Sequence, residues 1–200
     1  SHDLSELKDK NITAEVCVHH LFFNDADYET QGSLIKCNPA VKSAADQQAL
    51  LDAVRNDVLD IIATDHAPHT WEEKQNSYFK APSGVPLVQH SLQALLELYH
   101  NGVFSLETIV KKTSHAVAER FQVQDRGYIR EGYFADLVLL DLGKPYVVTD
   151  SNLLYLCGWS PFNGYRFQST IEMTLVNGQI AWQNGQVTDK VLGKRLTFNR

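Results

Sequence analysis

The chain has 200 residues, of which 44% are hydrophobic and 21% are charged, and this composition predicts a soluble globular protein with enough apolar material for a sizeable core. The formal net charge is -6, and Lys and Arg are scattered along the sequence, which argues against nucleic-acid binding. No apolar run approaches the roughly 18 to 20 residues that a spanning helix needs, so we expect no membrane segment and a cytoplasmic location.

The first part of the chain is predicted to alternate strand and helix. β-branched residues predict a strand over 12–18, which ends at His19 and His20. A capping-box pattern precedes a helix over 44–56, in which apolar residues recur at helical spacing. A nearly continuous apolar run then predicts a strand over 58–64, and this character suits a parallel strand that is buried on both faces.

Helices are expected to fill the stretch up to residue 121. Their predicted ranges are 87–100, 105–113 and 114–121. Pro86 can occupy the first turn of the longest helix, and Gly102 can close it. Ser105 and Ser114 are the expected caps of the two shorter helices.

The C-terminal third has the pattern of an antiparallel sheet. Strands are predicted over 135–141, 169–176 and 179–182. The pair Asn177-Gly178 predicts a type I′ hairpin turn, and Asn184-Gly185 predicts a further turn. The two or three α/β units before this sheet are too few to close an eight-stranded barrel, so a barrel here would be a piece of one.

A cluster of ionisable side chains follows the second predicted strand. Asp65, His66 and His69 fall within five positions. Chemistry in parallel α/β architectures collects at the carboxyl ends of the strands. Pro68 biases Ala67 towards an extended backbone, so His69 can reach back across this end. The pattern alone leaves an alternative open, in which Asp65 caps a turn and the histidines bind loop carbonyls.

The chemistry of an aspartate at this position depends on a metal ion. A free Asp has a pKa near 3.9 and is too weak a base to deprotonate water at neutral pH. A bound divalent ion lowers the pKa of its water to about 7, so an adjacent carboxylate can accept the proton and pass it to a leaving nitrogen. Asp65 is therefore a candidate for both metal ligand and proton carrier.

Six stretches of the chain resemble dihydroorotases of the amidohydrolase superfamily, a cyclic amidase type related to allantoinases and dihydropyrimidinases. They occur in the family's order, at 14–23, 36–39, 62–70, 81–86, 130–138 and 160–162. The D-H-A-P-H run with a downstream A-P-x-G is the most specific part. The chain departs from the family pattern at Val18, where the family usually has Pro, and at Ala40-Val41-Lys42, where it usually has Pro-Leu-Arg.

The resemblance implies a fold and a reaction. The fold is α/β: residues 1–125 are the C-terminal strands and helices of a (β/α)8 TIM-like barrel, and residues 126–200 are the C-terminal part of a small β-rich domain, a β-sandwich. The reaction is the reversible hydrolysis of dihydroorotate to N-carbamoyl-aspartate in pyrimidine biosynthesis, and it uses two Zn²⁺ ions. The implied partners are a second copy in a homodimer and, through a direct contact, aspartate transcarbamoylase.

The resemblance also assigns roles to single residues. Asp65 binds zinc and acts as the general base, while Asn38, His69 and the backbone around Ser83 and Gly84 bind the substrate. Gly84 has a physical basis of its own, because it precedes a predicted helix start, where free N–H groups favour an anion.

The remaining conspicuous side chains are expected to be structural. His19, His20 and His66 are interpreted as groups that anchor loops, with metal binding by the first two as the alternative. Three tryptophans are expected to be packing residues, at Trp71, Trp159 and Trp182. The run 72–74 is expected to be a solvated loop. Three cysteines are expected to be buried thiols, because Cys17, Cys37 and Cys157 are odd in number and form no C-x-x-C motif.

The zinc ligands of the family are incomplete in this sequence. The resemblance implies a His-x-His motif on the first barrel strand, and none occurs here. Because zinc binds about four ligands, Asp65 alone cannot hold it. The chain also opens on Ser-His-Asp without Met, so we expect a fragment that is inactive without the N-terminal half.

Two alternative functions remain open. One is a sister cyclic amidase that acts on hydantoins, dihydropyrimidines or allantoin. The other is a non-catalytic dihydroorotase-like scaffold. The sequence has no G-x-S-x-G, G-x-x-x-x-G-K or G-x-G-x-x-G motif, so the usual patterns of serine hydrolases, P-loop enzymes and Rossmann dehydrogenases do not apply.

Overall fold

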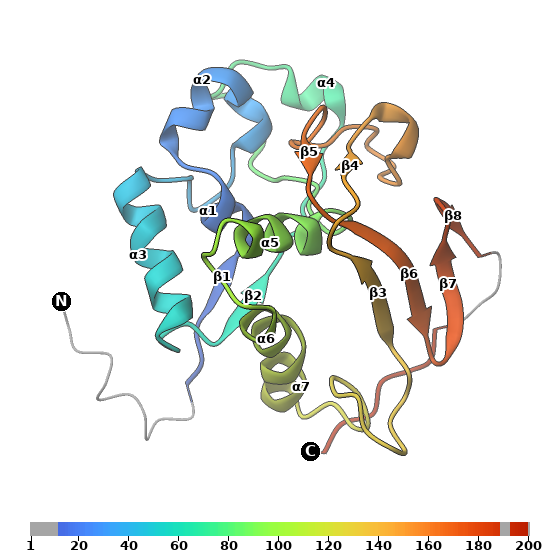
Figure 1. Ribbon diagram of the computed structural model, residues 1–200. Coiled ribbons are helices and arrows are strands. Elements are labelled where there is room, and N and C mark those ends of the chain that lie inside the picture. The colour runs from blue at the N-terminus through green and yellow to red at the C-terminus, as the bar shows by residue number, and fades with distance from the viewer. Residues whose placement is uncertain (1–11, 189–192, 200) are drawn as a thin grey trace.

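The computed structural model describes residues 12–188 and 193–199, and the fold is mixed α/β (Figure 1). The helices in this part of the chain are α1 Val18–Phe22, α2 Tyr28–Gln31, α3 Ala44–Arg55, α4 Trp71–Lys74, α5 Ser91–His100, α6 Leu106–Val110 and α7 Ala116–Phe121. The strands are β1 Glu15–Cys17, β2 Ile61–Ala63, β3 Leu137–Asp141, β4 Tyr146–Val147, β5 Arg166–Phe167, β6 Thr170–Val176, β7 Gln179–Gln183 and β8 Gln186–Val187.

Strands β1 and β2 form the parallel pair that the sequence predicts. Cys17 lies opposite Ala63 in the register, so the two carboxyl ends share one edge. Both strands are shorter than expected, because the chain turns directly from Cys17 into α1. His19 and His20 therefore lie in a short helix and not at the end of an extended strand. Helix α3 begins as predicted, with Ser43 accepting a hydrogen bond from the Asp46 N–H.

Helix α5 begins at Ser91, four residues later than predicted. The backbone N–H groups of Leu87 and Val88 donate to Nδ1 of His66, at 3.0 and 3.3 Å, and this tertiary contact holds them outside the helix. Pro86 therefore does not start the helix, and the prediction on this point is wrong. The later part of the helix follows the prediction and packs on α1 in the middle of the molecule (Figure 1).

The two short helices that we predicted are joined without a break. A π-helical turn, Lys111–His115, connects α6 to α7, so Ser114 is not a cap. Its hydroxyl donates instead to the carbonyl of Gly127 at 3.1 Å. Within this turn Lys112 is buried, and its Nζ binds Asp57 Oδ1 at 2.7 Å and the Leu59 carbonyl at 2.5 Å. The cap predicted at Ser105 is confirmed.

The C-terminal strands form the antiparallel sheet that the sequence predicts. The strand order is β3-β6-β7-β8, with every neighbouring pair antiparallel. Asn177 and Gly178 have φ values of 53° and 78°, as a type I′ turn requires. Asn184 and Gly185, at the next turn, also have positive φ values, of 53° and 78°. The separate pair β4-β5 has no counterpart among the predicted strands.

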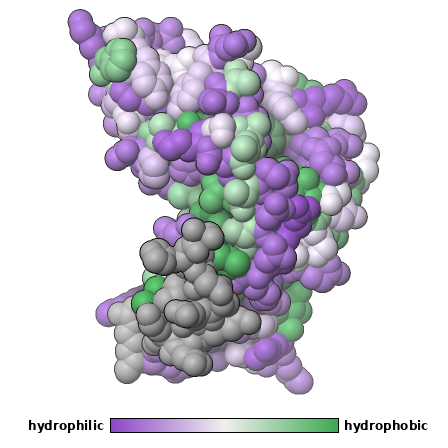
Figure 2. Space-filling model, turned by 90° about the vertical axis from the view of Figure 1, so that its left-hand side faces the viewer, coloured by the Kyte–Doolittle hydropathy of each residue, from purple (hydrophilic) through white to green (hydrophobic). Residues whose placement is uncertain are grey.

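One buried cluster joins segments from both halves of the chain. Phe162 stacks on Phe23, with ring centroids 5.4 Å apart, and contacts Phe22 edge to face at 5.1 Å. Phe167 and Val148 belong to the same buried cluster. The segment with β4 and β5 thus packs on α1 and α5, beside the larger sheet (Figure 1). On one face of the molecule hydrophobic residues also reach the surface near the middle (Figure 2).

Among the described residues, no helix is both long enough and apolar enough to cross a bilayer.

Candidate functional site

The carboxylate of Asp65 lies just beyond the carboxyl end of β2. The residue is exposed and has a left-handed backbone, with φ of 46°, which Asp tolerates better than most residues. Its side chain makes no hydrogen bond or ion pair with any residue in the part of the chain that the structure describes. The alternative in which Asp65 is tied into a turn as a cap is therefore not what the structure shows.

Two thiols lie near this carboxylate. Burial, with a smaller contribution from the negative charge of Asp65, raises the pKa of Cys17 to about 11. Burial also raises the pKa of Cys37, and the charge of Asp65 again contributes. Asp65 thus lies close to the end of β1 and to the Cys37 loop. Both thiols are protonated at neutral pH, so neither neutralises a cation at this edge without losing a proton.

His69 and Gly84 are fifteen positions apart in the sequence and lie side by side in the structure. His69 is half-buried, and its Nε2 donates to the Ser83 carbonyl at 3.1 Å. A Cβ added at Gly84 would lie 2.9 Å from the His69 ring and 2.4 Å from the Ala67 carbonyl oxygen. Only glycine fits here, and its φ of 144° also favours glycine. The predicted substrate-binding residues His69, Ser83 and Gly84 are therefore neighbours.

The backbone at Gly84 does not have the free N–H that the sequence suggested. α5 starts only at Ser91, so Gly84 does not precede a helix start. Its N–H donates to the Lys36 carbonyl at 2.9 Å. This bond ties the Gly84 loop to the loop that carries Asn38. Asn38 itself is exposed, and its side chain makes no hydrogen bond with the residues that the structure describes.

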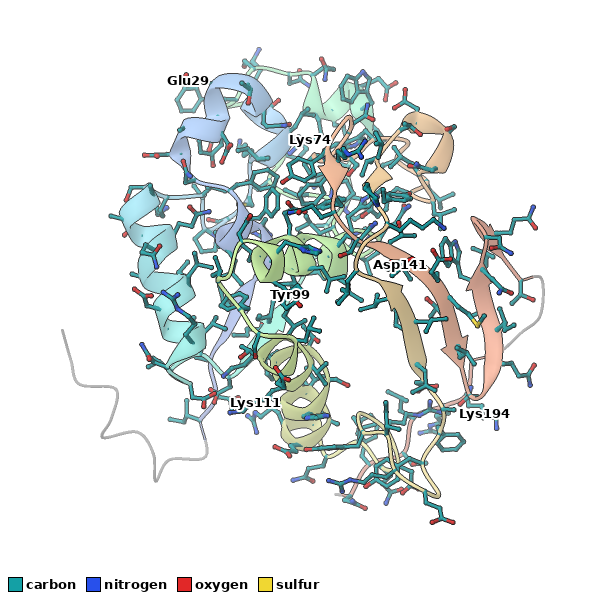
Figure 3. All side chains as sticks on the ribbon, in the orientation of Figure 1. Glu29, Lys74, Tyr99, Lys111, Asp141 and Lys194 are labelled. Carbon is teal, nitrogen blue, oxygen red and sulfur yellow. The ribbon has the colours of Figure 1, made fainter. Side chains whose placement is uncertain are left out.

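Lys74 is the residue that holds these loops, and sequence reasoning missed it. We expected a solvated loop at 72–74, but the structure has the short helix α4 there, and the Lys74 side chain is completely buried. Its Nζ donates to the carbonyls of Gly84 at 2.9 Å, Pro82 at 3.1 Å and Lys36 at 3.4 Å. Figure 3 shows Lys74 among densely packed side chains in the upper part of the molecule. Burial lowers its pKa to about 8.

His66 has the structural role that we predicted. Its Nδ1 accepts two backbone N–H bonds from the start of the segment that leads to α5. The ring also stacks on Tyr155, with centroids 5.6 Å apart. His66 thus links the Asp65 loop to residues more than twenty positions later.

The two consecutive histidines of α1 differ from each other. His20 anchors a loop as expected, because its Nε2 donates to the Pro39 carbonyl at 2.9 Å. His19 is buried, and neither ring nitrogen has a hydrogen-bond partner in the residues described. Burial, with a smaller contribution from His20, lowers the pKa of His19 to about 3. His19 is therefore a neutral imidazole at physiological pH.

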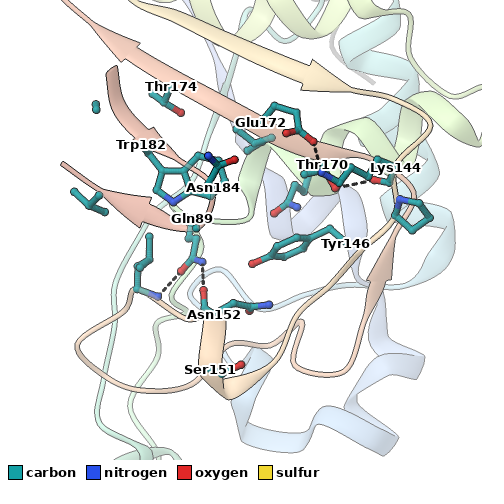
Figure 4. A pocket seen from close by; sticks show the side chains of 17 residues that line it. Gln89, Lys144, Tyr146, Ser151, Asn152, Thr170, Glu172, Thr174, Trp182 and Asn184 are labelled. Carbon is teal, nitrogen blue, oxygen red and sulfur yellow. Dashed lines mark hydrogen bonds and ion pairs between the residues drawn. The ribbon is translucent and has the colours of Figure 1, made fainter. Parts of the chain in front are cut away.

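The tryptophans do not all pack as expected. Trp159 is buried, and its Nε1 donates to the His69 carbonyl at 2.7 Å, so it supports the candidate site. Trp71 is 46% exposed. Trp182 lines a separate cavity of about 700 Å³ between the larger sheet and the start of α5 (Figure 4).

The polar side chains in this cavity bind one another. Lys144 pairs with Glu172 at 2.7 Å, and Gln89 binds the carbonyl of Asn152 and the N–H of Leu154 (Figure 4). None of the predicted site residues lines this cavity. The candidate site is therefore the open edge at Asp65.

The donors at this edge fit a metal centre only in part. Asp65 offers an exposed carboxylate at the expected position, but zinc needs about four ligands. In the part of the chain that the structure describes, one group of three or more potential ligands is found, Cys17, His19 and His20, and Asp65 is not a member. Asp65 can thus be one ligand of a centre that these residues do not complete.

The fold is mixed α/β, with a carboxylate and an imidazole just beyond the carboxyl end of a parallel strand, which is where enzymes of α/β architecture carry their active sites. The chain belongs to the amidohydrolase family, whose model matches residues 2–181.

Curated relatives in this family carry cyclic amidase names. The chain is 36% identical over 176 residues to a dihydroorotase of Halobacterium salinarum and 31% identical over 196 residues to one of Pyrococcus abyssi. It is 29% identical over 187 residues to an allantoinase of Desulfitobacterium hafniense. These matches cover 88%, 96% and 93% of this chain but 42%, 46% and 42% of the relatives. The chain therefore spans less than half the length of these relatives.

Solved structures agree with the fold. The L-hydantoinase (dihydropyrimidinase) from Arthrobacter aurescens superimposes with a TM-score of 0.86 at 28% sequence identity, covering 92% of this chain and 42% of that one. A dihydropyrimidinase from Brevibacillus agri gives a TM-score of 0.81 at 23% identity over the same shares, which supports the fold alone.

Proposed function

We propose that this chain is the C-terminal part of a zinc-dependent cyclic amide hydrolase that converts dihydroorotate reversibly to N-carbamoyl-aspartate. The single observation that carries the proposal is the unpaired carboxylate of Asp65 at the carboxyl edge of the β1-β2 pair. Family membership and the dihydroorotase names of several relatives at 31–36% identity support the same reaction.

In this proposal the fold divides in two. Residues 1–125 are the last strands and helices of a (β/α)8 barrel, and residues 126–200 are part of a small β-sandwich domain. The parallel pair in the first part and the antiparallel sheet in the second support this division. The relatives are more than twice as long as the match, so the N-terminal half would supply the rest of the barrel.

Asp65 would move the proton in the reaction. Water adds to the ring carbonyl and loses a proton to a carboxylate oxygen of Asp65, and the same proton is then delivered to the ring nitrogen as the C–N bond breaks. An exposed carboxylate without an internal partner is free to do this. Two zinc ions, with Asp65 as one ligand, would supply Lewis acidity towards water and carbonyl. Because the described residues do not complete that centre, we expect the chain alone to be inactive.

His69 and Asn38 would bind the substrate. His69 donates to the Ser83 carbonyl through Nε2, so its ring is oriented before substrate arrives. Asn38 is exposed on the neighbouring loop, where its amide can bind the carboxylate or ring of dihydroorotate. Ser83 and Gly84 would line the same side of the substrate. Their backbone is fixed by Lys74 and by the Gly84 N–H bond to Lys36.

The proposal is tested with the intact protein. We expect turnover of dihydroorotate, and a decrease of about 10² to 10⁴-fold in kcat for Asp65→Asn, the usual contribution of a general acid–base group. Asp60→Asn is the matched control, because Asp60 lies at the other end of β2, where its carboxylate binds the Ala14 N–H. An intact protein that hydrolyses dihydrouracil or hydantoin but not dihydroorotate would contradict the proposed substrate.

Two observations keep a second candidate function open. The hydantoinase structure with a TM-score of 0.86 and the allantoinase relative both favour a cyclic amidase of another specificity. A non-catalytic scaffold, with aspartate transcarbamoylase as its partner, is the third possibility. A scaffold would purify without stoichiometric zinc, whereas both enzymes would contain it. A homodimer and a cytoplasmic location remain predictions.

A further inference from the structure

Three potential metal ligands meet where β1 passes into α1. Cys17, His19 and His20 each present one ligand atom, and these atoms all lie within 4.8 Å of one another. Thiolate and imidazole together suit zinc and similar divalent ions. We propose that these three residues bind one such ion, at a site that does not depend on the reaction proposed above.

The unpaired ring of His19 is the independent observation behind this site. The side chain is 1% exposed, and neither ring nitrogen has a hydrogen-bond partner among the residues described. Buried polar groups without a partner are rare in folded proteins, and a bound ion can satisfy such a group. The ring of His19 lies against that of His20, with centroids 4.1 Å apart. A lone pair of His19 is thus available beside two other donors.

A backbone carbonyl beside His20 fits the pattern of a metal site. Histidines that bind metal commonly donate the second ring N–H to a carbonyl, which fixes the tautomer. His20 donates Nε2–H to the Pro39 carbonyl at 2.9 Å, so the lone pair remains on Nδ1. His20 therefore has a carbonyl on one side and a free lone pair for an ion on the other.

The distances require only a small adjustment. Tetrahedral zinc, with about 2.3 Å to sulfur and about 2.0 Å to nitrogen, separates its ligand atoms by about 3.3 to 3.6 Å. The ligand atoms, now within 4.8 Å of one another, need to approach by up to about 1.2 to 1.5 Å, and Cys17 and His20, which are both half-buried, can rotate to do so. On binding, the Cys17 S–H bond breaks, its proton leaves to solvent, and a sulfur–metal bond forms.

Charge near the site also favours a cation. Asp65 acts electrostatically on Cys17, so its negative charge lies close to the proposed ion. Three protein ligands would leave a fourth position open to water. Asp65 is not one of the three, and a metal centre that includes Asp65 would be a different one.

Cobalt absorption can test the site without reference to catalysis. The intact protein is stripped with a chelator and titrated with Co²⁺, whose bond to a thiolate gives a charge-transfer band in the near ultraviolet. We expect this band in the wild type, its loss on adding Zn²⁺, and its absence in Cys17→Ser. His20→Asn should weaken Co²⁺ binding at least tenfold. Cys157→Ser is the matched control, because Cys157 is also a half-buried free thiol, and it should keep the band.

Two further variants separate this site from others. Asp65→Asn should keep the band, whereas it should abolish the hydrolysis proposed above, so the two proposals fail independently. Cys37 Sγ lies 3.8 Å from His20 Nε2 and is the competing thiol. A band that survives Cys17→Ser, or no band in the wild type, would overturn the inference. Circular dichroism of each variant confirms that it folds, and Zn²⁺ should raise the melting temperature of the wild type but not that of Cys17→Ser.

Discussion

Replacing Lys74 by Met should loosen the two loops that carry the candidate substrate-binding residues. The Lys74 ammonium donates to three carbonyls, of Gly84, Pro82 and Lys36. The Lys36 carbonyl keeps a second donor, the Gly84 N–H, in the variant. The carbonyls of Pro82 and Gly84 have no other hydrogen-bond donor among the described residues. Leaving the buried Gly84 carbonyl unpaired costs about 1–3 kcal/mol, and the half-buried Pro82 carbonyl adds a smaller loss, so we expect a local loss of at least about 1 kcal/mol.

Hydrogen exchange followed by mass spectrometry measures this local effect. The peptide with Gly84 should exchange faster in Lys74→Met by a factor that corresponds to this loss, at least about fivefold. Lys80→Met is the matched control, because Lys80 is exposed in the same segment and its side chain makes no hydrogen bond among the described residues. Equal exchange in both variants would refute the reasoning, since it would mean that Lys74 contributes burial without holding the carbonyls.

Three smaller predictions follow from single contacts. Gly84→Ala should raise KM and lower stability more than Gly132→Ala, because Gly132 also has a positive φ, of 86°, but has open space where a Cβ would lie. Similar KM and stability values for the two variants would show that the close approach at Gly84 is unimportant. Burial lowers the pKa of His90 to about 4, so the unfolded chain takes up a proton first and stability should fall as pH falls from about 6.5 to 4. In thermal melts, the stability of His90→Leu should fall less steeply over this range, and an unchanged slope would show that His90 is not the group responsible. Ser105→Ala removes the hydroxyl that accepts from the Thr108 N–H and should cost about 1 kcal/mol in urea unfolding, against almost nothing for Ser91→Ala.

Local patterns predicted the elements well where local interactions decide them. The capping box at Ser43 and the hairpin at Asn177-Gly178 appear in the structure as expected, because each depends on a few neighbouring residues. The parallel pairing of β1 and β2 agrees with the apolar run that contains β2, because such a run suits a parallel strand buried on both faces. The start of α5 was wrong because His66, more than twenty residues earlier, takes up the N–H groups of Leu87 and Val88.

Less of the candidate site could be predicted from the sequence. His69, Ser83 and Gly84 were chosen by resemblance, since no spacing rule links positions fourteen residues apart. Lys74 was missed because Glu-Glu-Lys is an ordinary surface pattern, and the carbonyls that hold its ammonium lie in segments 8 to 38 residues away. The burial of Lys74 can be recognised only from the tertiary structure, in which those segments lie together.

The backbone at Asp65 explains how the adjacent residues Asp65 and His66 have different roles, one at the open edge and one in holding the later loop. β2 ends at Ala63, and the left-handed φ of Asp65 then turns the chain. His66 consequently forms a parallel bridge with Val85 and binds the segment beyond it, while the Asp65 carboxylate stays at the open edge. The bridge also brings the Ala67 carbonyl so close to Gly84 that no Cβ fits there. The left-handed turn at Asp65, the bridge at His66 and the close approach at Gly84 therefore belong to one arrangement of the backbone.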